Sequence, residues 1–119
     1  MKENIIKNKS FDFALRIIEL YKSMLKDNEY VLSKQVLRSG TSIGANVEEA
    51  SAAQTKKDFI AKMSIASKEA RETKYWLILI QQSKLCNSTL PIQDLLNDNE
   101  ELICMLTAIV KTSQLKSYN

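Results

Sequence analysis

Apolar residues recur along the chain at helical spacing, which predicts α-helices instead of strands. The clearest stripe lies in the last segment, where apolar residues follow one another at intervals of three, four and seven positions. The stripe consists of Ile92, Leu95, Leu96, Leu102, Ile103, Leu106, Ile109 and Val110. The four predicted helices span about residues 11–27, 30–53, 55–85 and 91–115.

Capping residues support these boundaries. Thr55, followed three positions later by Asp58, resembles a capping box, and Pro91 suits a first helical turn. The gap between the second and third helices is short, so it is either a loop or a kink. The expected caps are Ser10 for the first helix, Thr55 for the third, and Ser88 or Thr89 for the fourth.

The first helix carries more apolar surface than one buried face needs. Two stripes cover well over half of its circumference, whereas a helix on the outside of a small bundle should show one. The first stripe is Phe11, Ala14, Leu15, Ile18, Tyr21 and Leu25, and the second is Phe13, Ile17, Leu20 and Met24. The segment YWLILI at 75–80 is also apolar all round; a strand is the alternative, but the segment continues a helix without a break. The surplus implies a partner, most economically another copy of the chain.

Both glycines of the chain, Gly40 and Gly44, lie four positions apart within the second helix. Glycine in a helix costs about 1 kcal/mol relative to alanine. The pair therefore indicates a groove in which another helix backbone packs closely, as glycine pairs allow in membranes. The alternative is that the helix kinks or breaks at Gly40.

A second feature of this helix is a seam of polar residues on one side of its core stripe. Arg38, Ser42, Asn46 and Glu49 recur at positions i, i+4, i+8 and i+11. An arginine and a glutamate on one partly buried face can pair, with serine and asparagine filling the remaining hydrogen bonds. Two interpretations stay open: a structural network that fixes helix register or subunit contacts, and a contact to a ligand or nucleic acid.

Composition limits the fold and the location. The 119 residues are 45% hydrophobic with one proline and two glycines, which predicts one all-α domain over 1–119. No apolar run is long enough to cross a membrane and no signal peptide is evident, so we expect a cytoplasmic protein. Cys86 and Cys104 should lie roughly 20 Å apart, so we expect two free thiols.

Catalytic and metal chemistry has little support. The chain has no histidine, which removes the commonest general base and metal ligand, and no phosphate-binding glycine loop. Carboxylates are available at Glu48, Glu49, Glu69 and Glu72, but a bundle metal site usually pairs glutamate with histidine. We therefore expect no enzyme activity, no cofactor and no metal.

The charge is mildly basic and unevenly spread. The formal net charge is +3, but residues 54–88 carry seven basic and three acidic residues. On the third helix, Lys57, Lys68 and Arg71 fall within a sector of about 60°, beside Tyr75. This stripe is either a solvated face or a surface that follows phosphates, with Tyr75 either a stacking platform or part of the core or an interface.

The stretch RSGTSIGANVEEA at 38–50 resembles the signature R-S-x-x-S-I-x-x-N-[IV]-x-E of a bacterial four-helix-bundle family. That family includes proteins encoded within intervening sequences of 23S rRNA genes, and the stretch is also similar to the accessory variability determinant of diversity-generating retroelements. The resemblance continues in KKDFIAKMSIASKEARETKYWL and covers about residues 11–115. The matching residues are Arg38, Ser39, Ser42, Asn46 and Glu49, and Ala50 stands where many members have glycine.

The resemblance implies an antiparallel four-helix bundle, its assembly into a pentameric ring, and an association with RNA or DNA. Together with the basic stripe, it leads to the hypothesis of a non-catalytic, homo-oligomeric accessory protein that binds nucleic acid, such as rRNA. The competing hypothesis is a scaffold that binds another protein and never contacts nucleic acid. Neither hypothesis involves a membrane.

Overall fold

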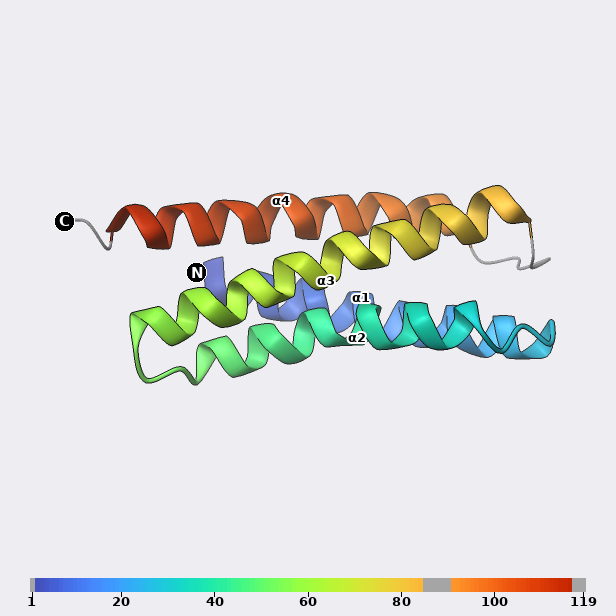
Figure 1. Cartoon of the computed structure of the whole chain (residues 1–119), viewed down its shortest axis with the longest axis horizontal. Helices are drawn as coiled ribbons and strands as arrows, with labels where there is room; N and C mark the ends of the chain where they lie inside the picture. Colours follow the sequence, from blue (N-terminus) through green and yellow to red (C-terminus); the bar gives the residue numbers. More distant parts are fainter. Residues whose placement is uncertain (1, 85–90, 117–119) are drawn as a thin grey trace.

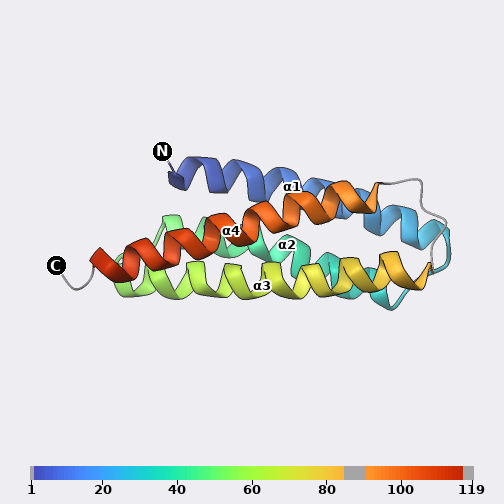
Figure 2. The same ribbon diagram turned by 90° about the horizontal axis from the view of Figure 1, so that it is seen from above.

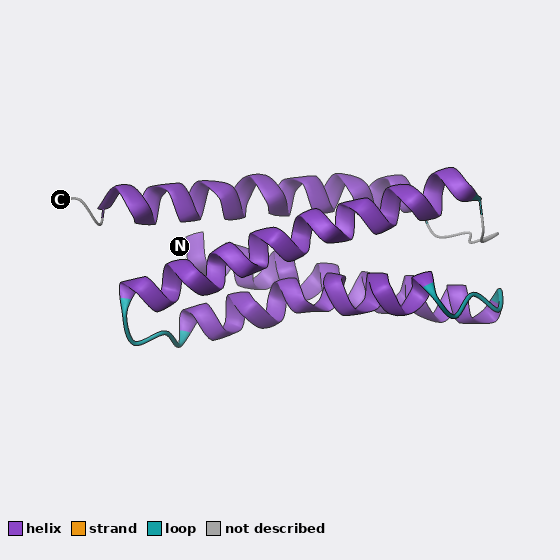
Figure 3. Cartoon of the chain, viewed as in Figure 1, coloured by secondary structure: helices purple, strands orange, loops and turns teal. Residues whose placement is uncertain are grey.

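The computed structural model describes residues 2–84 and 91–116, and these form an all-α, four-helix bundle without strands (Figures 1 and 3). The helices are α1 (Lys2–Lys26), α2 (Leu32–Ser51), α3 (Lys56–Ser83) and α4 (Ile92–Lys116). Successive helices run in opposite directions, so that α1 begins and α4 ends at the same end of the bundle (Figure 2). The molecule measures 52 by 22 by 21 Å, so the bundle is elongated along its helices.

Helix α1 starts earlier than the sequence pattern indicated. Ser10 is not its N-cap: it is buried within α1, and its hydroxyl donates to the carbonyl oxygen of Lys7 at 3.2 Å. Ile6 is also fully buried and extends the stripe of Phe13 and Ile17 by two turns. Because this segment has no glycine or proline, packing of Ile6 carries the helix back to Lys2.

The other helix ends are set by local chemistry. Thr55 caps α3 as expected, since its hydroxyl oxygen accepts a hydrogen bond from the backbone N–H of Asp58 at 3.0 Å. Glu29 caps α2, because its carboxylate accepts from the N–H groups of Leu32 and Ser33 at 3.0 and 2.8 Å. A loop separates α2 from α3, so these helices are not one kinked helix. Ser88 and Thr89 lie outside the described residues.

One apolar core runs along the bundle and receives side chains from all four helices. Each helix packs against its neighbours in the chain, whereas α1 and α4 approach each other over a shorter stretch. Of the two stripes on α1, the one with Phe13, Ile17, Leu20 and Met24 is buried in this core. None of the described helices combines the length and the apolarity needed to cross a bilayer.

Candidate functional site

The polar residues singled out on α2 lie on the side of that helix that faces α3. Arg38 reaches two carboxylates of α3: its Nη1 donates to Glu69 Oε2 at 3.0 Å, and its Nη2 pairs with Glu72. The hydroxyl of Ser42 donates to the same oxygen of Glu69 at 2.5 Å. Glu69 therefore accepts hydrogen bonds from two residues of α2, and only 19% of its side chain is exposed.

A buried pair of hydroxyl groups lies next to this contact. Ser39 and Thr73 are both fully buried, and their side-chain oxygens are 2.9 Å apart. Thr73 Oγ1 also lies 2.8 Å from the backbone carbonyl oxygen of Glu69. Since a hydroxyl group has one proton and can also accept, neither the Ser39 nor the Thr73 hydroxyl is left unpaired. We call Arg38, Ser39, Ser42, Glu69, Glu72 and Thr73 the α2–α3 seam.

The seam continues outward to the single tryptophan. Glu72 Oε2 accepts from the indole N–H of Trp76 at 2.9 Å in addition to its pairing with Arg38. These two hydrogen bonds, that of Trp76 first and that of Arg38 second, lower the pKa of Glu72 from its ordinary value. The hydrogen bond with Glu72 in turn raises the pKa of Arg38. Arg38 therefore offsets one of the two negative charges of Glu69 and Glu72 within the seam.

Asn46 and Glu49 do not share this network. Asn46 donates from Nδ2 to the carbonyl oxygen of Ser42 at 2.8 Å, one turn back on its own helix. Glu49 pairs with Lys62 of α3 at 2.8 Å, near the surface. The expected pairing of Arg38 with Glu49 was wrong, because eleven positions correspond to about 16 Å along a helix, whereas α3 presents carboxylates directly opposite Arg38.

The two glycines lie on the other flank of α2, under α1. Helix α2 passes through Gly40 and Gly44 without a break. A methyl group placed on Gly40 would lie 2.9 Å from both Cγ1 and Cγ2 of Ile17, and one placed on Gly44 would lie 3.4 Å from the carbonyl oxygen of Ser10. Helix α1 thus packs onto bare backbone at both positions, and most closely at Gly40.

The basic stripe lies on the outer face of α3. Lys57, Lys68 and Arg71 are exposed, and neither lysine forms an ion pair with any residue in 2–84 or 91–116. Arg71 extends toward α4, where Nη2 donates to Thr107 Oγ1 at 3.2 Å. Tyr75 is 58% exposed, so it belongs to the surface and not to the core of this chain.

On α1, the first apolar stripe, which contains Phe11 and Leu15, stays partly open to solvent. Phe11 is 64% exposed and Leu15 is 50% exposed. Together with Ala14, Ile18 and the small residues of α2 beside Gly44, they line a mostly apolar hollow of about 490 Å³. Monomeric proteins rarely expose large contiguous apolar patches, so this hollow is a candidate contact surface.

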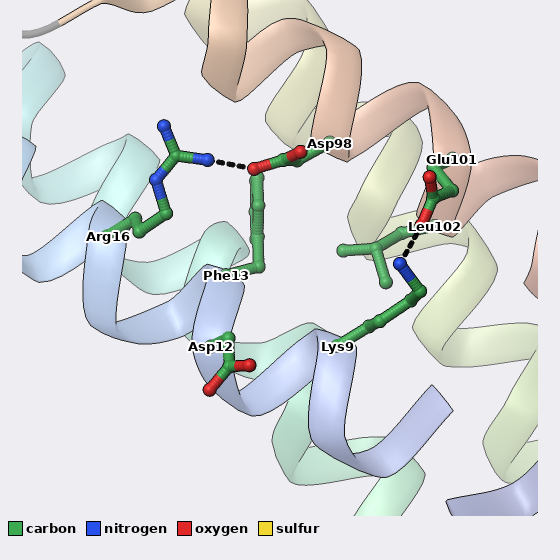
Figure 4. Close-up of a pocket in the computed structure, with 7 residues that line it drawn as sticks. All are labelled: Lys9, Asp12, Phe13, Arg16, Asp98, Glu101 and Leu102. Carbon is green, nitrogen blue, oxygen red and sulfur yellow. Dashed lines mark hydrogen bonds and ion pairs between the residues drawn. The ribbon is translucent and has the colours of Figure 1, made fainter. Parts of the chain in front are cut away.

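A smaller hollow of about 180 Å³ lies between α1 and α4 (Figure 4). Ion pairs between Lys9 and Glu101 and between Arg16 and Asp98 bridge the two helices on either side of Phe13. The hydrogen bond with Glu101 raises the pKa of Lys9. Because these charged groups pair with each other across the gap, they form a second helix–helix contact, at the surface.

Sequence reasoning missed Asn99 of α4. Its side chain is fully buried, and Nδ2 donates to the backbone carbonyl oxygen of Ala70 on α3 at 3.1 Å. Its Oδ1 accepts no hydrogen bond from a described residue. The sequence did indicate burial of Asn99 through its position, since it lies four residues after Leu95 and three before Leu102 on the core stripe.

Cysteine and metal chemistry add no site. Cys104 is an exposed free thiol, and Cys86 lies outside the described residues. The segments 2–84 and 91–116 contain no cluster of three or more cysteine or carboxylate side chains that could hold a metal ion.

Comparison with known proteins assigns the chain to a family. The family model of the 23S rRNA-intervening sequence protein matches residues 2–108. The chain belongs to this family. A similar fold occurs in a crystal structure from Bacteroides thetaiotaomicron, described as a protein with unknown function from the S23 ribosomal protein family. That structure is 47% identical to the chain, has a TM-score of 0.87, and is matched over 93% of this chain and 99% of the other. No protein of curated function matched the chain.

Membership of the 23S rRNA-intervening sequence protein family confirms the resemblance drawn from RSGTSIGANVEEA. The matched region begins with α1 and includes all of α2 and α3, and therefore both flanks of the signature stretch. Because most signature residues have partners within the chain, the family motif accounts for how α1, α2 and α3 pack. Residues without a partner inside the chain are therefore the better candidates for a ligand-binding surface.

Proposed function

We propose that the protein is a non-catalytic, homo-oligomeric accessory protein that binds nucleic acid through the outer face of α3. One observation carries the proposal: Lys57, Lys68 and Arg71 share this exposed face, and no acidic residue lies in the same sector of α3. In contrast, Lys62 and Lys74 on the flanks of α3 are neutralised by Glu49 and Glu100. Unneutralised cations in a row are the feature that binds a phosphate backbone.

The second half of α4 extends the basic surface. Between Leu102 and Lys116 the described chain has no acidic residue, and Lys111 lies one turn after Thr107, about 40° around α4. Arg71 links the two helices through Thr107, so its guanidinium group lies between the stripe on α3 and this part of α4. A phosphate strand that follows α3 would therefore meet cations from both helices.

Assembly would strengthen weak contacts. The open apolar stripe of α1, with Phe11 and Leu15, supports association with a second copy of the chain. The family resemblance implies a ring of five, in which the formal charge of +3 and the stripe of α3 would each be repeated five times. Several weak phosphate contacts then act together through effective concentration.

Fluorescence anisotropy tests the proposal. Protein cleared of carried-over nucleic acid is titrated into labelled duplex RNA, single-stranded RNA and DNA at low and physiological salt. We expect micromolar or tighter binding whose logarithm falls linearly with the logarithm of the salt concentration, with a slope that reports the number of phosphate contacts. No binding at low salt would contradict the proposal.

Charge reversal locates the surface. The triple variant Lys57→Glu, Lys68→Glu and Arg71→Glu should weaken binding at least 10-fold at low salt, because it removes three cations that contact phosphates. It should also flatten the plot of log K against log salt, to which each contact contributes a slope of roughly 0.7–0.9. The matched control reverses three exposed lysines away from the stripe: Lys26→Glu, Lys34→Glu and Lys84→Glu. Both variants change the net charge equally, so equal losses would show that only the total charge matters.

A protein-binding scaffold is the second candidate, and the apolar hollow beside Phe11 and Leu15 favours it. Affinity purification with and without nuclease treatment separates the two functions. Partners that stay bound after nuclease treatment, combined with no binding of pure nucleic acid, would support the scaffold.

A further inference from the structure

We propose that Tyr75 is a stacking platform for an unpaired base of single-stranded nucleic acid, and that Trp76, Glu72 and Arg38 hold its ring in position. This inference rests on the function proposed above and specifies the ligand as a single strand. Its starting point is the exposed ring of Tyr75, which lies one helical turn beyond Arg71 on the face that carries Lys57 and Lys68. Single-strand sites combine cations that follow the backbone with aromatic rings that stack on bases.

The ring of Tyr75 packs against that of its neighbour Trp76. Its centroid lies 5.2 Å from that of Trp76, and the two ring planes are inclined by 70°, an edge-to-face arrangement. The indole N–H of Trp76 is held by Glu72, and Glu72 is held by Arg38 of α2. An exposed ring that is already oriented loses less conformational entropy when a base stacks on it than a freely rotating ring does.

The same chain of contacts weakens an electrostatic obstacle. Glu69 and Glu72 lie on α3 beside the stripe, where two uncompensated carboxylates would repel phosphate groups. Arg38 forms ion pairs with both and offsets one of their two negative charges. The three cations Lys57, Lys68 and Arg71 therefore outweigh the remaining negative charge beside the stripe.

The spacing suits a strand that runs along α3. Lys68 precedes Tyr75 by seven positions, which corresponds to about 10 Å along the helix. A phosphate at Lys68 or Arg71 would thus place the next bases of the same strand near Tyr75. In a duplex these bases are paired and stacked on one another, so the ring of Tyr75 could not reach their faces.

The fluorescence of Trp76, the single tryptophan of the chain, reports on Tyr75 because the two rings are in contact. Two labelled probes are compared: oligothymidylate of roughly 12 nucleotides, within the usual site size, and an abasic strand of equal length. We expect oligothymidylate to bind more tightly and to quench the fluorescence of Trp76. The abasic strand should bind through its phosphates and leave the fluorescence unchanged.

Variants of the two rings assign their roles. Tyr75→Leu should weaken oligothymidylate binding roughly 5- to 100-fold and leave binding of the abasic strand unchanged, whereas Tyr75→Phe should retain both. Trp76→Leu should weaken only the base-dependent part of binding, and Trp76→Phe should restore most of it because the edge-to-face contact is kept. Melting temperature and oligomer mass are measured for each variant.

Three results would overturn the inference. Equal, salt-dependent binding of both probes without quenching would exclude stacking and leave the proposed function standing. Binding of neither probe at low salt would remove the proposed function and the inference together. A change of oligomer mass in Tyr75→Leu would assign the ring to a contact between subunits.

Discussion

The two flanks of α2 hold their neighbours by different means. Toward α1 the contact is steric: Gly40 has no side chain, and the fully buried Ile17 occupies the space. Toward α3 the contact is polar, with Arg38 and Ser42 converging on Glu69. The first kind of contact sets how closely two helices approach, and the second sets which residues face each other.

This difference explains why one short stretch carries both glycines and several signature residues. Both flanks lie within 38–50, and both serve packing inside the chain. The stripe on α3 is different, because Lys57 and Lys68 have no ion-pair partner in the described part of the chain. The signature stretch therefore serves stability, and the outer face of α3 is the surface that we propose for binding.

The steric flank gives the largest expected effect. Gly40→Ala should lower the free energy of unfolding by up to about 2 kcal/mol, because overpacking costs about 1–3 kcal/mol and the better helix propensity of alanine offsets about 1 kcal/mol of this cost. Ile17 cannot move aside easily, since it is fully buried and β-branched. Gly44→Ala is the matched control and should leave stability unchanged or raise it by up to about 1 kcal/mol. Urea denaturation measures both variants, and equal effects would show that α1 does not pack more closely at Gly40.

The polar flank should respond to loss of Glu69. Glu69→Ala should cost about 1–2 kcal/mol, because it removes the acceptor shared by Arg38 and Ser42 in a half-buried site. Asp98→Ala removes a carboxylate that pairs with Arg16 at the surface and should cost less than about 0.5 kcal/mol. Chemical denaturation of the two variants compares them directly, and a larger loss for Asp98→Ala would contradict our view of the seam.

The buried hydroxyl pair should show coupling of about 1 kcal/mol. The double-mutant cycle combines Ser39→Ala with Thr73→Val and compares the sum of the single effects with the double variant. As a control, Ser39→Ala and Ser51→Ala should be additive, since Ser51 is exposed and bonded only within its own helix. Additive effects for Ser39 and Thr73 would mean that their hydroxyl groups do not depend on each other.

The smallest effect concerns pH. The pKa of Glu72 is lowered in the folded protein, so the unfolded chain binds more protons as the pH falls below about 4.3. The stabilisation by Glu72 is therefore complete above that pH and is lost as the pH falls through the folded-state pKa. With 36% of the side chain exposed, the effect should stay below about 1 kcal/mol. The difference in unfolding free energy between wild type and Glu72→Gln should shrink from pH 7 to pH 3, and a difference that grows would reverse the sign of our assignment.

Much of the fold follows from sequence patterns, because helical periodicity and caps act locally. The core stripe of α4 and the cap at Thr55 could be predicted in this way. The start of α1 could not, because burial of Ile6 against the rest of the bundle decides it and Ser10 only resembles a cap.

The partners of polar residues were harder to predict. Periodicity placed Arg38 and Glu49 on one side of α2, but it cannot show which carboxylate of another helix lies opposite. Asn99 was missed because an asparagine adds nothing to an apolar stripe even when it occupies a core position. The exposure of Tyr75 also depends on how α3 is rotated in the bundle, which the near-uniform apolarity of YWLILI does not reveal.

The most direct test of the central claim measures nucleic-acid affinity by anisotropy, at low salt and below the melting temperature, for one stripe variant and one seam variant. The stripe variant is Lys57→Glu, Lys68→Glu and Arg71→Glu, and the seam variant is Glu69→Ala. We predict that the stripe variant loses at least 10-fold in affinity with an unchanged melting temperature, whereas the seam variant melts earlier and keeps its affinity within about twofold. Loss of affinity in the seam variant at unchanged stability, with full affinity in the stripe variant, would contradict the account and place the binding site on the signature residues.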